Sequence, residues 1–147
     1  MPTRSASSAI RVSCLVASLG PFGVELSAQG AAAAIERGLR AAGRSEVDAL
    51  ALDAAPHDLA DERFDARMLA SRTVVLVQDR LAPEALAGSL TAEIATRARQ
   101  SGVPAYAVVR RREIDDFDAR VLDLQAILEA DDAAGLRRAG RELAKLL

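Results

Sequence analysis

Length, composition and charge narrow the classes of protein to which this chain can belong. Its 147 residues are 50% hydrophobic and 27% charged, a balance that suits one compact domain. The formal net charge of -2 is spread along the chain and aromatic residues make up only 3%, so we expect no nucleic-acid partner and no membrane partner.

The amino-terminal segment, residues 1–9, is rich in serine and is expected to be a disordered leader. The apolar run from Ile10 to Leu19 is interrupted by Ser13 and Ser18 and is too short to span a bilayer, so we interpret it as the first strand and not as a signal sequence. Cys14, the only cysteine, lies in this run and is expected to be buried and inert. Because no internal disulfide can form, a reducing, cytoplasmic compartment is favoured.

Helix and strand signals then alternate. Ser27 is a suitable N-cap for an alanine-rich helix that ends at Gly43, and a second strand is expected over residues 47–52. Asp58 is expected to cap a shorter helix that holds Leu59, Phe64, Met68 and Leu69.

The clearest unit runs from Thr73 to Val109. A β-branched apolar run ends at Gln78, a polar turn follows, and Pro83 opens an amphipathic helix that stops near Gly102, before a second apolar run. This order predicts two parallel strands joined by a right-handed crossover. The turn over residues 78–84 is then expected at the edge of the sheet where such folds place ligands.

The carboxy-terminal third completes the pattern. We expect a charged loop pinned by Ile114 and Phe117, a fifth strand within residues 122–128, and a final helix capped by Asp131 or Asp132. The contacts that this helix is expected to bury are Leu136, Leu143 and Leu146. The whole pattern predicts an α/β fold, a three-layer sandwich around a mostly parallel, five-stranded Rossmann-like sheet, as a single domain over residues 10–147.

Several segments resemble the glycerate kinases of the two-domain, Rossmann-like type. The first turn and helix read SLGPFGVELSA and AAAAIERGL, where that family has APDSFKGSLSA and a helix ending near RGL. The later turn reads VQDRLAPEALAGS, where the family has approximately GEGRLDxQSLxGK, and the segments VDALALD and SGVPAYAVV are similar to two of its strands. About twenty residues join the second and third strands, a normal connection length, so the chain resembles the core of such a kinase without its inserted domain.

The departures from that family fall where phosphoryl transfer would take place. This chemistry needs cations on the phosphates and carboxylates that hold magnesium. Of the family's Asp-Ser-Phe-Lys-Gly turn only Phe22 persists. In the later turn the family's glutamate, glycine, aspartate and lysine are replaced by Gln78, Asp79, Ala82 and Ser89, whereas Arg80, Leu81, Leu86 and Gly88 persist. Lys145 is the only lysine, so the family's ammonium groups are missing as well. Because these site residues are replaced, we expect no catalytic residues and no metal site.

Two groups of residues remain candidates for binding a ligand. The Gly-Pro-Phe-Gly turn at residues 20–23 precedes a helix N-terminus and could cradle an anion, or it is simply a tight turn. Arg80 and the arginines at 110–112 follow two strands and could converge on a carboxylate or phosphate, or they form a solvated surface balanced by nearby acids. His57, the only histidine, has neither a second ligand nor a nucleophile near it in the sequence. The candidate ligand-binding set is Gly20, Phe22, Gly23, Gln78, Arg80, Gly88, Arg110 and Arg112.

Two functions follow from this reading. The first is a degenerate, noncatalytic glycerate-kinase-like domain that binds a small anionic metabolite or a protein partner. It is expected to form a homo-oligomer, because loss of the inserted domain uncovers apolar surface. The alternative is an ATP-dependent kinase that phosphorylates glycerate or a similar hydroxy acid, alone or as one part of a split enzyme. Only this alternative calls for cofactors, namely ATP and magnesium.

Overall fold

The computed structural model describes residues 14–52, 58–61 and 63–147. Five parallel strands form one sheet in the order β2-β1-β3-β4-β5. The strands are β1 (Cys14–Leu19), β2 (Val47–Leu52), β3 (Val74–Leu81), β4 (Ala105–Arg112) and β5 (Leu124–Glu129). The predicted α/β sandwich with a parallel five-stranded sheet is confirmed, and the order 2-1-3-4-5 is a common doubly wound arrangement.

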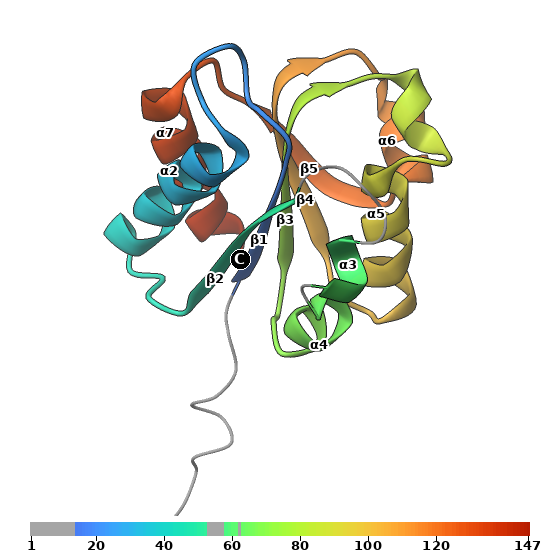
Figure 1. Cartoon of the computed structure of the whole chain (residues 1–147), viewed down its shortest axis with the longest axis horizontal. Helices are drawn as coiled ribbons and strands as arrows, with labels where there is room; N and C mark the ends of the chain where they lie inside the picture. Colours follow the sequence, from blue (N-terminus) through green and yellow to red (C-terminus); the bar gives the residue numbers. More distant parts are fainter. Residues whose placement is uncertain (1–13, 53–57, 62) are drawn as a thin grey trace, which may run out of the picture.

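Helices cover both faces of this sheet (Figure 1). On one face α2 (Ala28–Ala41) and α7 (Ala133–Leu146) lie side by side. Among the described residues, the helices on the other face are α3 (Asp58–Asp61), α4 (Phe64–Leu69), α5 (Leu90–Gln100) and α6 (Asp116–Val121), together with the 3-10 turn η1 (Pro83–Leu86). Successive side chains of a strand point to opposite faces, so β1, buried at all six residues, contributes to two separate cores.

The contact between α2 and α7 is unusually close. Gly38 and Gly140 face each other with no side chain between the helices, and their neighbours are backbone atoms. A Cβ on Gly38 would lie 2.1 Å from the carbonyl oxygen of Arg137, and one on Gly140 would lie 2.5 Å from that of Ile35. The two glycines therefore set the distance between these helices. They also hold α7 close to α2, away from the edge strand β5.

Several local predictions are confirmed. The side chain of Ser27 accepts a hydrogen bond from the backbone N–H of Gly30 and caps α2, and Asp132 caps α7 in the same way through Gly135. Cys14 is fully buried, and this burial raises the pKa of its thiol to about 12. The predicted leader, the first residues of the predicted first strand and His57 lie outside the described residues.

The helix predicted to open at Pro83 begins later. β3 continues to Leu81, η1 follows, and α5 starts only at Leu90. Gly88 has a φ of 73°, which interrupts a right-handed helical path, and the hydroxyl of Ser89 then accepts from the N–H of Ala92 as a new N-cap. Ser89, which stands where the glycerate kinases that the sequence resembles have a lysine, thus serves here to start a helix.

The predicted charged loop after Val109 is also different. Residues 105–112 form one long strand, and α6 follows, capped by Asp115. Ile114 is buried as expected, but Phe117 is 69% exposed and Leu146 is 51% exposed, so neither makes the predicted core contact. The connection before β3 contains two short helices, α3 and α4, where one was predicted.

Candidate functional site

The carboxyl edge of the sheet has the geometry that usually accommodates a ligand in doubly wound folds. The chain leaves β1 and β3 toward opposite faces, which makes the space above these two neighbouring strands a topological switch point. β3 and β4 extend beyond the other strands there, still paired through Arg80 with Arg111 and Leu81 with Arg112. The turn between β1 and α2 faces this two-stranded extension.

Asp79 on β3 joins the three segments at this point. Its Oδ1 accepts a hydrogen bond from the Nε of Arg110 on β4 at 2.6 Å, and its Oδ2 accepts from a terminal nitrogen of the same guanidinium at 3.3 Å. The backbone N–H of Gly23, in the turn after β1, donates to the same Oδ1 at 2.7 Å. The carboxylate therefore holds the turn, β3 and β4 together.

Two features of the turn allow this contact. The backbone N–H of Phe22 donates to the carbonyl of Leu26, which closes the turn, and the Phe22 ring is buried in the core under α2. Gly23 has a φ of 66°, in the left-handed region that favours glycine, and this aims its N–H at Asp79. Gly20 donates its N–H to Leu52 and fastens the start of the turn to the end of β2.

The charges of this group neutralise one another. The Arg110 guanidinium, by its hydrogen bonds, lowers the pKa of Asp79, the Gly23 N–H adds to that effect, and partial burial opposes it. Asp79 in turn raises the pKa of Arg110. Asp79 is therefore ionised and Arg110 charged at neutral pH, and the two form a salt bridge whose side chains are 35% and 27% exposed.

A cleft of about 490 Å³ lies beside this salt bridge. It is lined by the turn at residues 22–26, by Arg110, and by the start of α7 at residues 131–134. Glu25, Asp131 and Asp132 give its wall three carboxylates against the single, already paired Arg110. The electrostatics of the cleft thus disfavour an anion.

Gln78, Arg80 and Gly88 lie on the opposite face of the sheet. Gln78 accepts a hydrogen bond from the hydroxyl of Thr91 on α5 and donates to the carbonyl of Arg80. Arg80 donates to Glu113 at 2.7 Å and to Glu84 at 3.2 Å, so its guanidinium is shared between two acids on the surface. Gly88 lines a separate hollow before α5.

The remaining two arginines of the cluster, Arg111 and Arg112, form no salt bridge with Asp79. Arg112 donates to the carbonyl of Ile114 at 3.0 Å and to the carboxylate of Asp116 at 2.7 Å, which fastens it to the start of α6. Arg111 is exposed and makes no hydrogen bond or ion pair within the part of the chain that the structure describes. The structure brings Phe22, Gly23 and Arg110 together, but it does not bring Arg80 or Arg112 to them.

Asp79, the residue on which the group depends, was not among the sequence candidates. In the sequence it is noted only because it stands where the glycerate kinases that the chain resembles have a glycine. A carboxylate near the end of one strand and an arginine near the end of the next strand are a usable signal, because parallel neighbours bring their carboxyl ends to one edge. Among the described residues there is no cluster of three or more His, Cys, Asp or Glu side chains able to hold a metal ion, and no helix is long and apolar enough to cross a membrane.

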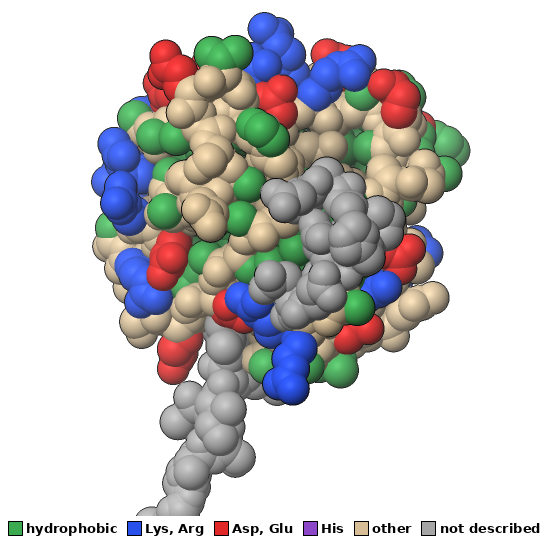
Figure 2. All heavy atoms as spheres, viewed as in Figure 1, with side chains coloured by type: hydrophobic (Ala, Val, Ile, Leu, Met, Phe, Trp, Pro, Cys, Tyr) green, Lys and Arg blue, Asp and Glu red, His purple; other side chains and the backbone are tan. Residues whose placement is uncertain are grey.

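The visible surface carries no broad field of one charge. On the face shown in Figure 2, acidic and basic side chains are interspersed over both helical layers. Such a surface offers little long-range steering to a charged ligand.

Comparisons with known proteins support the fold. No protein-family model and no curated protein matches this chain. Among solved structures, it is similar to a crystal structure of a protein from Burkholderia pseudomallei described as pilus assembly-related, with a TM-score of 0.54. That likeness covers 91% of this chain and 90% of the other at 15% sequence identity, so it bears on the fold alone.

Proposed function

We propose that this chain is a degenerate, noncatalytic glycerate-kinase-like domain that acts by binding a protein. The sequence segments quoted above support the relationship to the kinases. One structural observation carries the choice of protein over small anion: Arg80, Arg110 and Arg112 are each already bonded to a carboxylate and they point away from a common centre. A phosphate-binding site needs cationic groups that converge.

An anion entering beside Arg110 would have to displace Asp79. The carboxylate would then lose the guanidinium fork and, with movement, the Gly23 N–H as well. A bound phosphate would also face Glu25, Asp131 and Asp132 across the cleft. Both effects oppose a small anionic metabolite, whereas a protein surface can make many weak contacts and needs no converging cations.

The proposal is tested by incubating the pure chain with ATP, magnesium and glycerate and following the products by phosphorus NMR. No phosphoglycerate is expected. A parallel titration of the isotope-labelled chain with ATP, glycerate or inorganic phosphate should leave the amide signals of Gly23 and Arg110 in place.

Two outcomes of these experiments would overturn the proposal. Phosphoglycerate that forms with the native chain and with Arg72→Ala, but not with Arg80→Ala, would overturn the noncatalytic role and favour the kinase. Arg72 is a matched control because it is exposed, lies before β3 at the amino edge of the sheet, and is outside the candidate set. Saturable shifts at Gly23 and Arg110 without turnover would overturn the choice of protein and favour the anionic metabolite.

A further inference from the structure

An open groove of about 840 Å³ follows α7 and is lined by the end of the edge strand β5 and by Ala42 at the end of α2. Its floor includes Leu128 and Ala130 at the end of β5 and Ala139 and Ala144 on α7. The groove exists because α7 packs closely against α2 at Gly38 and Gly140 and so leaves the outer part of the sheet on this face uncovered. Of these residues only Leu128 is half-buried, whereas the three alanines are 5 to 7% exposed, so the groove offers a partner a small apolar contact surrounded by charged side chains.

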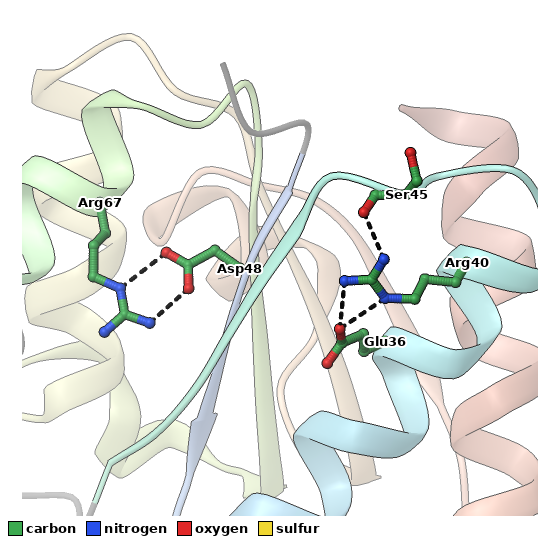
Figure 3. Close-up of polar contacts among 5 residues, drawn as sticks. All are labelled: Glu36, Arg40, Ser45, Asp48 and Arg67. Carbon is green, nitrogen blue, oxygen red and sulfur yellow. Dashed lines mark hydrogen bonds and ion pairs between the residues drawn. The ribbon is translucent and has the colours of Figure 1, made fainter. Parts of the chain in front are cut away.

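The other edge of the sheet is protected by charge. On β2, Asp48 receives two hydrogen bonds from the guanidinium of Arg67 on α4, at 2.6 and 2.9 Å. On the other side of this strand, Arg40 donates to Glu36 and to the carbonyl of Ser45, which precedes β2 (Figure 3). Charged side chains that flank an edge strand are a recognised protection against association.

The β5 side lacks that protection among the described residues. Strand β5 reads LQAILE, with its single charge, Glu129, at the last position. Leu128 is only partly buried against the core on the α7 side. Association is therefore favoured at β5 over β2.

The charges around the groove are arranged in a self-complementary way. The end near the carboxyl edge carries Glu129 and Asp131, whereas the distant part of α7 carries Arg138, Arg141 and Lys145. Lys145 is paired with Glu142, but Arg138, Arg141 and Asp131 make no ion pair with any described residue. If two grooves meet about a twofold axis perpendicular to α7, the α7 helices run antiparallel, and the acidic end of each faces the basic end of the other.

From this arrangement we propose that the groove between α7 and β5 is filled by a second copy of the same chain, with Asp131 of each copy facing Arg141 of the other. An isologous contact of this kind uses one patch twice and closes as a dimer. Gly135 and Ala139 are buried against the chain's own core, so the contact with a second copy is made chiefly by the half-buried Leu128 and by the charged side chains around the groove. The inference rests on the proposed protein-binding role and names its partner.

The test uses sedimentation equilibrium of the full chain over a wide range of concentration. The native chain is expected to show a concentration-dependent monomer–dimer equilibrium. Arg141→Asp and Asp131→Arg, each alone, should weaken the dimer about tenfold, because each places like charges opposite one another. The chain carrying both changes should recover near-native affinity, since each copy then presents the exchanged pair.

Arg72→Asp is the control with the same change of charge outside the groove, and it should leave the dimer unaffected. A mass that stays monomeric at every concentration would overturn the proposal and leave the groove to a different protein. A dimer indifferent to both single reversals would also overturn it, because the contact would then lie elsewhere. A monomer without kinase activity would leave the proposed function standing, whereas a dimer that forms phosphoglycerate would refute that function and keep the interface.

Discussion

Asp79 illustrates how one side chain determines the character of the candidate site. Its carboxylate satisfies a backbone N–H of the turn after β1 and binds the guanidinium of Arg110 at the same time. Both groups would otherwise be available to a ligand. The residue therefore converts an edge that could hold an anion into a fixed junction of three segments.

Replacing the Asp79 carboxylate by an amide should lower the stability of the folded chain. Asp79→Asn keeps an oxygen that can accept from Gly23 but removes the charge that Arg110 faces. We expect the free energy of unfolding at neutral pH to fall by about 1 kcal/mol, in the range for partly exposed charge-assisted hydrogen bonds. Denaturant titration of the two chains measures the difference.

The pH dependence of that difference tests its cause. Because the pKa of Asp79 is lower in the folded chain than in the unfolded chain, its contribution is present above the unfolded pKa of about 4 and is lost as pH falls through the folded value. The gap between native and Asp79→Asn should therefore close in acid. Asp116→Asn, which alters an 86% exposed partner of Arg112, should cost only a few tenths of a kcal/mol. A gap that persisted at all pH values would contradict the electrostatic explanation.

The pairing of β3 with β4 explains why the sequence alone could not decide whether the arginine side chains converge. The register pairs Arg80 with Arg111, so Arg80 and Arg110 point to opposite faces of the sheet. A shift of one residue in that register would have placed them together. The sequence shows two charged strand ends, but it does not specify the register to within one residue.

At the scale of elements, the packing of α2 on α7 depends on two glycines. Gly38→Ala would place a methyl group against the carbonyl of Arg137, a backbone atom that cannot move aside without shifting α7. We expect a loss of about 1 to 3 kcal/mol in the free energy of unfolding, in the range for overpacked contacts. Thermal and denaturant unfolding of the variant measure this loss.

Gly30→Ala, in the same helix, is the matched control. The added methyl group would meet the end of the Leu26 side chain at 3.3 Å, and that side chain is partly exposed and can adjust. Because alanine favours helix over glycine, we expect no loss, and a gain of up to about 1 kcal/mol. Equal destabilisation by both changes would show that the helix contact is not the cause.

Elements with strong local signals were predicted well, and elements defined by tertiary contacts were not. Ser27 and Asp132 precede periodic apolar runs and mark true helix starts. The start of α5 was missed because Pro83 is a helix opener in isolation, whereas Gly88 and Ser89 act only after β3 has been extended by pairing with β4. Phe117 was expected to pin the loop because it is apolar, but it lies on α6 with most of its side chain exposed.

At the scale of the whole molecule, the sheet has a protected centre and two different edges. β1 and β3 each pair with strands on both sides, and β1 is buried along its whole length. β5 pairs on one side only, through a register that is irregular between Ala105 and Ala107, and its residues are exposed or half-buried. Local opening of β5 therefore breaks fewer contacts than opening of β1.

This contrast predicts the pattern of amide hydrogen exchange under native conditions. In dilute solution, amides of β1 and β3 should exchange only through global unfolding, whereas those of β5 should open locally at a free energy lower by about 2 kcal/mol or more. Raising the protein concentration should slow exchange in β5 and along α7, since a second copy in the groove must leave before β5 can open. Amides of β2 provide the internal control, because that edge is held by Asp48 and Arg67 and lies outside the proposed contact. Equal slowing at β2 and β5 would argue against a dimer that uses one edge alone.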